Sequence, residues 1–265
     1  MKNNITIKDV AREAGVSVAT VSYVINERSD KRISDKTRKK VLQVINLLGY
    51  TPNQSAKALA TNRSGMAALY VSPDFSTLKN AEQLHFINFL ASFLHEKNYD
   101  LIYLSDTYKD KFDHADAILC YDISSEYFRQ IGDNNFAPLI ALDCMINDPL
   151  FFQINSDYEK IAQRAKKHFH DNPYTLCLLD TPNQERKEYL QPLFEHIVYV
   201  KDFADLSALS DRNILVIEQT LYDCLKNRSN VCYLPTLTTE KAEVLLSCME
   251  NAIKRIPIEK HDLLV

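Results

Sequence analysis

The sequence predicts a two-part chain, in which a small all-α helix-turn-helix segment precedes an α/β region with two lobes. In residues 6–48, apolar residues recur at helical spacing within short segments, whereas from residue 66 short apolar strands alternate with amphipathic helices. The charge divides at the same place. Residues 1–65 hold 12 basic and 5 acidic side chains, a net +7, and residues 66–265 hold 19 and 30, a net −11. We therefore expect the N-terminal segment to meet a polyanion.

The composition excludes several classes of protein. Of the 265 residues, 46% are hydrophobic and 25% charged, which is typical of globular proteins. No stretch approaches the ~20 apolar residues of a membrane span, and the first residues lack the apolar core of a secretory signal. The six cysteines are scattered without a CxxC pair, which favours reduced thiols over disulfides or a metal site. These features predict a cytoplasmic protein without membrane contact.

Residues 6–48 are expected to form three helices, over 7–14, 18–25 and about 35–48. Gly15 lies where a tight turn joins the first two, and a helix, a Gly-containing turn and a second short helix make a helix-turn-helix. The expected caps are Thr6, with Asp9 completing a capping box, then Ser17, Ser34 or Asp35, and Gly49. The expected core between the first two helices is Val10, Ala14, Val16, Val21, Val24 and Ile25.

Two stretches of this segment carry a family resemblance. They are TIKDVAREAGVSVATVSYVIN and SDKTRKKVLQVINLLGYTPNQSAKALA, and the DVA, GVS, ATVS, VIN, KTR and GY elements stand in register from Ile5 to about Gly65. The segment resembles the lactose-repressor/galactose-repressor (LacI/GalR) family of bacterial transcription regulators. The resemblance implies a helix-turn-helix DNA-binding domain over residues 1–48, a hinge over 49–65 and an effector-binding and dimerisation domain over 66–265.

The resemblance implies that the second helix lies in the major groove, with Val18, Ala19 and Tyr23 reading bases. Val18 and Ala19 offer only apolar contact, most naturally with a thymine methyl group. Tyr23 stands where arginine is frequent in the family, and tyrosine cannot bind guanine bidentately. The implied phosphate contacts are Ser17, Thr20, Ser22, Asn26, Ser34, Thr37 and Tyr50. Helix capping is a further role for Ser17 and Ser34. Arg28, Lys31 and Arg32, in a loop about two residues longer than the short family versions, are phosphate contacts or solvated charges.

The resemblance also implies a hinge helix in the minor groove of the operator. Asn53, Ala56 and Lys57 match hinge contact positions, and Leu59 matches a leucine wedged between the two central base pairs. The segment over 52–65 is too short and polar to fold alone. A plain interdomain linker is the alternative, and an apolar Leu59 in a polar stretch counts against it.

From Met66 the alternation of strands and helices predicts parallel sheets in two lobes with a cleft between them. The expected strands lie at 66–73, 99–104, 116–121, 138–143, 174–180, 196–200 and 213–218, and the expected helices at 81–98, 124–132, 156–172, 183–196 and 239–256. The apolar stripe of the first helix is expected to be Leu84, Ile87, Leu90 and Leu94, and Thr239 is expected to cap the last. The region is similar to the family's effector domain, which resembles periplasmic sugar-binding proteins, but it looks shortened. A helix between Leu104 and Ala115 and a strand between Glu218 and Leu234 are expected to be missing.

By family position, the residues implied to contact an effector are Ser72, Asp74, Asp143 and Arg186. They would hydrogen-bond the hydroxyl groups of a sugar or a similar polar molecule. The alternatives are that the two aspartates cap neighbouring helices and that Arg186 is a solvated helix charge. For Arg186 we favour the solvated charge, because the pocket looks incomplete.

The predicted function is a sequence-specific transcription regulator, a repressor that binds a palindromic double-stranded operator as a homodimer under the control of a sugar-like small molecule, or with that control lost. The alternative is a stand-alone small-molecule-binding protein whose helical segment serves a protein contact. Only DNA binding through phosphates should weaken steeply with salt. The sequence holds none of the GxGxxG, GxxxxGK[ST], GxSxG or HExxH motifs, and His168 and His170, two apart on a helix, make a poor metal pair. We therefore expect no enzyme, catalytic residue, metal or cofactor.

Overall fold

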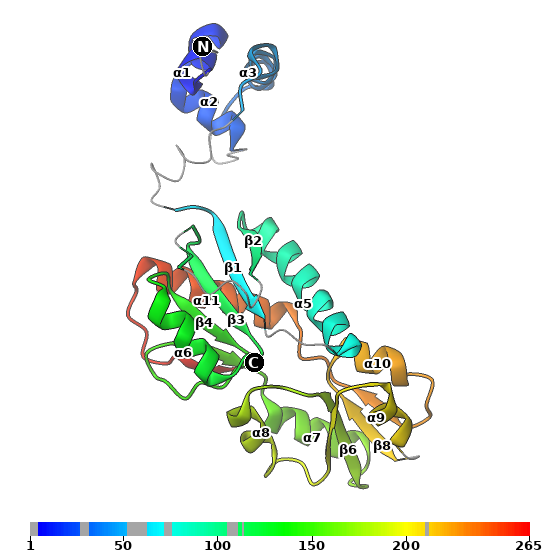
Figure 1. Ribbon diagram of the computed structural model, residues 1–265. Coiled ribbons are helices and arrows are strands. Elements are labelled where there is room, and N and C mark those ends of the chain that lie inside the picture. The colour runs from blue at the N-terminus through cyan, green and yellow to red at the C-terminus, as the bar shows by residue number, and fades with distance from the viewer. Residues whose placement is uncertain are drawn as a thin grey trace. The chain divides into compact units, whose positions relative to one another are not determined.

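The computed structural model describes residues 5–26, 32–51, 63–71, 76–104, 111–112, 114–209 and 212–265. The chain divides into two compact units, Met1–Arg63 and Ser64–Val265, which we call the head and the body. Each unit is described by itself (Figure 1).

The head contains three helices, α1 (Ile7–Ala14), α2 (Val18–Ile25) and α3 (Asp35–Leu48), with the bounds that the sequence predicts. Thr6 and Asp9 form the expected capping box, and Gly15 takes a φ of 64° in the turn between α1 and α2. Ser34, rather than Asp35, caps α3. The apolar faces of all three helices meet in one core around Val10, Val21 and Val41.

The body contains two parallel sheets. The first has the strand order β10-β5-β4-β3-β1-β2 and the second β7-β6-β8-β9. The strands are β1 (Met66–Val71), β2 (Asp100–Leu104), β3 (Ala117–Tyr121), β4 (Leu139–Leu142), β5 (Phe152–Asn155), β6 (Tyr174–Leu179), β7 (Ile197–Val200), β8 (Asn213–Val216), β9 (Val231–Tyr233) and β10 (Asp262–Leu264). The two sheets define the two expected lobes, which we call lobe 1 and lobe 2.

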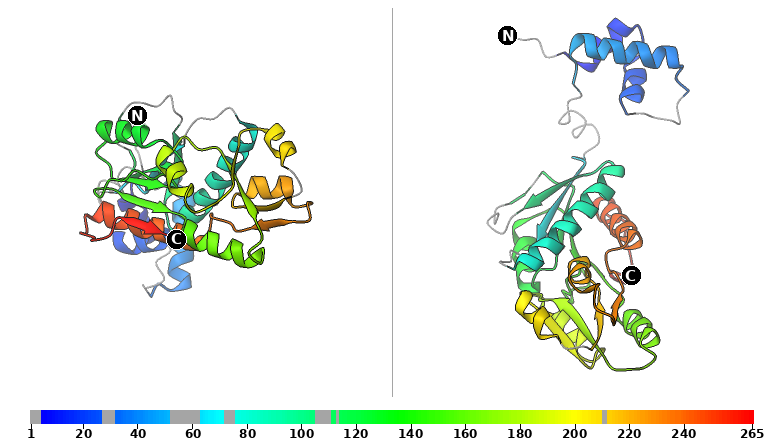
Figure 2. Two further views of the ribbon diagram at one scale, coloured as in Figure 1. Left: turned by 90° about the horizontal axis from the view of Figure 1, so that it is seen from below. Right: turned by 90° about the vertical axis from the view of Figure 1, so that its right-hand side faces the viewer.

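Helices cover both faces of each sheet (Figures 1 and 2). On one face of lobe 1, α5 (Thr77–Glu96) and α11 (Thr239–Lys254) share a core, and α6 (Ser125–Asn134) packs on the other. In lobe 2, α7 (Tyr158–His168) and α8 (Gln184–Leu190) cover one face, and α9 (Phe203–Ala208) and α10 (Gln219–Leu225) cover the other.

Several sequence expectations for the body are wrong in detail. A strand between Glu218 and Leu234 is present as β9, and the expected absence is corrected. The four-residue β5 and the three-residue β10 and β9 were not anticipated, because runs this short carry no readable alternation. Thr238, not Thr239, caps α11. Ser76 caps α5, which begins four residues earlier than expected.

The buried face of α5 also differs from the predicted stripe. Leu84 is 57% exposed, whereas the buried side chains include Lys79 and Glu82 beside Phe86 and Leu90. The stripe was predicted from apolar residues alone, and it therefore missed the charged residues on the buried face. The burial of Lys79 and Glu82 shows that this part of α5 packs against polar groups as well as apolar side chains.

Candidate nucleic-acid interface and interlobe cleft

The first turn of α2 presents its side chains to solvent. Val18 is 40% exposed, Ala19 is also exposed and Tyr23 is half-buried, while Val21 and Val24 face the core. An apolar patch at the start of a helix-turn-helix second helix can contact thymine methyl groups in a major groove. The base-reading roles of Val18, Ala19 and Tyr23 stay predictions.

Short polar side chains surround this patch and already bond within the head. Ser17 Oγ accepts the Thr20 amide at 3.1 Å, and Asn26 Nδ2 donates to the Ser22 carbonyl at 2.8 Å. Ser34 Oγ accepts the Thr37 amide at 3.2 Å, and Tyr50 packs beside the head core. The capping roles of Ser17 and Ser34 are confirmed, and the phosphate contacts stay predictions.

Other predicted residues lie outside the described residues. They are the hinge residues Asn53, Ala56, Lys57 and Leu59, the loop residues Arg28 and Lys31, and the effector candidates Ser72 and Asp74. Arg32 is described and exposed.

One carboxylate fixes the backbone where the body begins. Asp116 accepts hydrogen bonds from the Ser64 amide at 2.6 Å, the Ser64 hydroxyl at 3.0 Å and the Gly65 amide at 2.9 Å. Gly65 has a φ of 73°, which a side chain would oppose. Sequence reasoning missed Asp116, whose only signal is an acid directly before a buried strand.

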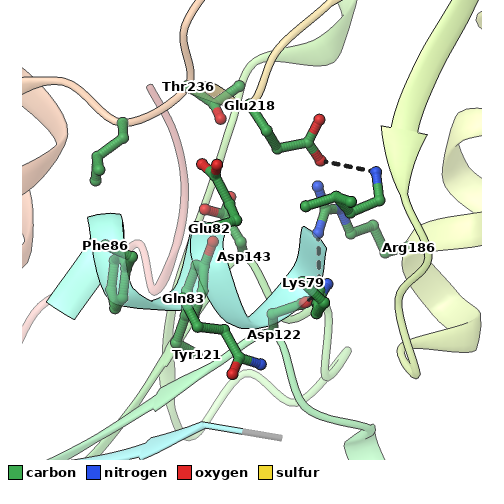
Figure 3. Close-up of a pocket in the computed structure, with 12 residues that line it drawn as sticks. Lys79, Glu82, Gln83, Phe86, Tyr121, Asp122, Asp143, Arg186, Glu218 and Thr236 are labelled. Carbon is green, nitrogen blue, oxygen red and sulfur yellow. Dashed lines mark hydrogen bonds and ion pairs between the residues drawn. The ribbon is translucent and has the colours of Figure 1, made fainter. Parts of the chain in front are cut away.

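Two aspartates follow neighbouring strands of lobe 1 and point into the cleft between the lobes (Figure 3). Asp122 follows β3 with a φ of 50°, and Asp143 follows β4 with a φ of 48°. A left-handed backbone is uncommon outside glycine, although aspartate tolerates it better than most residues. Local strain of this kind concentrates at functional sites, which makes the cleft a candidate site.

Asp122 collects partners from both lobes. It accepts hydrogen bonds from Lys79 Nζ of α5, from Arg186 Nη1 at 3.2 Å and from Thr181 Oγ1 at 2.6 Å. All of these side chains are buried. The structure therefore corrects the interpretation of Arg186 as a solvated helix charge: Arg186 is 6% exposed and ion-paired across the cleft.

Asp143 forms a second buried ion pair. Lys241 Nζ in the first turn of α11 donates to Asp143 Oδ1 at 2.5 Å and to Ser156 Oγ at 2.9 Å. Burial lowers the pKa of Lys241, an effect that the Asp143 carboxylate opposes. Thr238 supplies the side-chain cap of α11, so the capping role considered for Asp143 is not seen there.

Lobe 2 contributes a buried carboxyl group. Glu218 follows β8, and one of its oxygens accepts the Leu179 amide at 3.3 Å. Burial, reinforced by the nearby Glu82 carboxylate, raises the pKa of Glu218 to about 8. Among the described residues, its other oxygen, the Arg186 Nε and the Tyr158 hydroxyl have no hydrogen-bond partner.

The cleft has little free space. The side chains around it leave about 20 Å³ for a water-sized molecule, which is roughly the room that one water needs. Sequence reasoning missed Lys79, Glu82, Asp122, Glu218 and Lys241. The available signal was that the charged residues Lys79 and Glu82 stand at helical spacing from the apolar Phe86.

The described residues hold no cluster of three or more His, Cys, Asp or Glu side chains that could bind a metal. Within the same residues, no helix is both long and apolar enough to cross a membrane. Five of the six free cysteines are buried and Cys224 is exposed.

Comparison with known proteins gives a family for the helix-turn-helix segment. The model of "Bacterial regulatory proteins, lacI family" matches residues 6–53. The HTH-type transcriptional regulator DegA of Bacillus subtilis is 58% identical over 71 residues, which are 27% of this chain and 20% of DegA. The probable HTH-type transcriptional repressor ExuR of Bacillus subtilis is 28% identical over 216 residues, which are 74% of this chain and 62% of ExuR. The alignments thus span from a fifth to about three fifths of these relatives.

A solved structure shares the fold of the whole chain. The lac repressor dimer bound to operator and the anti-inducer ONPF aligns with a TM-score of 0.58 and 14% identity, over 99% of this chain and 96% of that one. At this identity the likeness concerns the fold alone. The shared architecture is a helix-turn-helix head followed by a two-lobe α/β body. Residues 6–53 of the chain are thus similar to the lacI family of bacterial regulatory proteins.

Proposed function

We propose that this protein is a cytoplasmic, non-catalytic transcriptional repressor that binds a palindromic DNA operator as a homodimer. One observation carries the proposal: the exposed first turn of α2 belongs to a basic segment whose residues 6–53 match the lacI family. The second helix of such a domain lies in the major groove. Two half-sites require two heads, which the dimer supplies.

The alternative of a stand-alone small-molecule-binding protein is not favoured. Its helical head would need to serve a protein contact, whereas the head matches a DNA-binding family. Control by a sugar-like effector is part of the proposal only if the cleft opens, because about 20 Å³ cannot hold a sugar.

Selection from a random DNA pool with the full chain, followed by affinity measurements over a range of salt, tests the proposal. We expect a palindromic sequence, with log affinity falling linearly with log salt, by a slope of roughly 0.9 per phosphate contact. Val18→Glu should abolish the selected binding, because it places a carboxylate where bases are expected.

Leu47→Glu is the matched control, since it adds the same charge on α3 at a residue that is 78% exposed. It should retain the preference for the selected sequence over random DNA. Equal loss in both variants, or an affinity independent of salt, would reject the DNA-binding role of α2.

A further inference from the structure

The first turns of α5 belong to lobe 1 by chain order but dock in lobe 2. Leu78 is 3% exposed and packs in a lobe 2 core with Leu179 and Val216. The Ser76 hydroxyl donates to the Lys201 carbonyl of lobe 2 at 2.5 Å. Figures 1 and 2 show this end of α5 lying beside α10. The helix therefore reaches across the cleft.

The ammonium group of Lys79 contacts both lobes. Its Nζ contacts the Asp122 carboxylate of lobe 1 and donates to the Asp180 carbonyl of lobe 2 at 2.8 Å. The side chain is 6% exposed. A buried ammonium group is tolerated only when it is paired and hydrogen-bonded, and both conditions are met only when the lobes are together.

Glu82, one helical turn further along, makes the complementary contact. Its carboxylate accepts the Thr220 amide at 2.8 Å and the Gln219 amide at 3.4 Å, at the start of α10 in lobe 2. The residue before α10, Glu218, makes no side-chain cap of its own. A carboxylate from lobe 1 thus satisfies the amides that would otherwise lack partners.

Aromatic side chains fill the remaining floor of the cleft. Phe86 of α5 stacks on Tyr121 at the end of β3, with ring centroids 3.7 Å apart and an interplanar angle of 8°. An amphipathic ligand would find this apolar surface already covered. A site for a polar ligand typically offers charged groups and an aromatic ring. Here α5 supplies all of them, as Lys79, Glu82 and Phe86.

We propose that Lys79 and Glu82 act as an internal latch, which occupies the interlobe cleft in place of a small molecule and holds the body closed without a ligand. The latch rests on the proposed function in one respect, because it describes how the cleft of the proposed regulator is controlled. It predicts that lobe closure is a property of the chain itself. A ligand would have to displace the two side chains before it could bind.

The distance between the lobes tests the latch directly. Cys224, the exposed cysteine, lies in α10 of lobe 2, and Asn134→Cys adds a second label site on the exposed surface of α6 in lobe 1. Spin labels on this pair, diluted with unlabelled protein, report the interlobe distance by pulsed electron resonance. We expect a single narrow distribution in the ligand-free parent. Lys79→Met with Glu82→Gln should shift or broaden the distribution toward longer distances.

The control is Glu96→Gln with Lys97→Met, the same two changes at the exposed end of α5. It should match the parent. Lys79→Arg, which keeps the charge, should restore a narrow distribution in the presence of native Glu82 and shows that the site tolerates substitution. A broad distribution in the parent, or an unchanged one in the latch variant, would overturn the proposal.

Chemical rescue adds a second measurement. Lys79→Ala should leave a space for a small cation, so 1-propylammonium chloride should narrow the distribution again while equimolar sodium chloride should not. If Lys79→Ala shows a narrow distance distribution before the cation is added, and 1-propylammonium does not change it, the role of the ammonium group is overturned. All of these distances are measured without DNA, so their failure is distinct from a failure of operator binding, which the same samples report in gel shifts.

Discussion

Polar side-chain contacts cap the helices of the head and line the cleft of the body, but they span different lengths of chain. In the head, Thr6 with Asp9, Ser17 with Thr20 and Ser34 with Thr37 bond across three residues. In the cleft, Lys79 reaches Asp180, 101 residues away, and Glu82 reaches Thr220, 138 residues away. The head is therefore specified locally, whereas the state of the cleft depends on how two distant parts of the chain are brought together. Damage to the cleft should change the body and leave the head folded.

Lys241→Met should give the largest effect. It leaves the Asp143 carboxylate buried without its charge partner, and breaking a buried pair in this way typically costs about 3–5 kcal/mol of the unfolding free energy. Urea denaturation followed by circular dichroism measures the loss. Lys254→Met is the control, because Lys254 pairs with Glu250 at the surface and is half exposed, where pairs contribute about 0–1 kcal/mol. Similar losses in both variants would contradict the buried ion pair.

Leu78→Ala should be next in size. Removal of this buried side chain from the lobe 2 core should destabilise the body by about 2–5 kcal/mol. Leu84→Ala, in the same helix at an exposed residue, should stay within about 0.5 kcal/mol of the parent. Denaturant melts of the two variants separate the predictions, and a stable Leu78→Ala would mean that α5 is not anchored in lobe 2.

The stability of the body should depend on pH through Glu218. Its pKa is about 8 in the folded chain and 4.5 by default, so the folded state holds this proton more tightly than the unfolded state. The contribution of Glu218 to stability is full below about pH 4.5 and is lost as the pH rises to about 8. Glu218→Gln should remove this decline and raise the melting temperature at pH 8 by several degrees relative to the parent. Parallel pH profiles for parent and variant would refute the assignment.

Tyr23→Arg should act on the head alone and have the smallest effect on stability. Arginine can bind guanine bidentately and tyrosine cannot, so the change should alter preference at one base pair per half-site by about 1–3 kcal/mol. Binding to a library of sites measures the preference. A uniform change over all sites would show that Tyr23 reads no base. An altered melt of the body would contradict the separation of the two units.

The same difference in contact length explains what the sequence could predict. The helices of the head and their caps follow from residues three or four apart, such as Ser17 and Thr20, and α1, α2 and α3 have their predicted bounds. The two-lobe α/β class follows from the alternation of strands and helices. The partners of Arg186 and Asp143 could not be predicted, because Asp122 and Lys241 become neighbours only through the fold. In α5, nothing in the local sequence singled out Lys79 and Glu82, since burial of a charge depends on a partner that the local sequence does not contain.

The strands of lobe 2 follow one another in the sequence, whereas lobe 1 is completed only by α11 and β10. Strand β10 pairs with β5 in a register that joins Asp262 to Gln153, and α11 packs on the core beside Leu90. Residues 157–234 of lobe 2 thus lie between the two parts of lobe 1. Segments separated by this much chain pair slowly, because the entropy lost in bringing them together is not compensated until their contacts form. During synthesis, the strands of lobe 2 are all made before the last strand of lobe 1. We therefore expect lobe 2 to fold first and lobe 1 to be completed last.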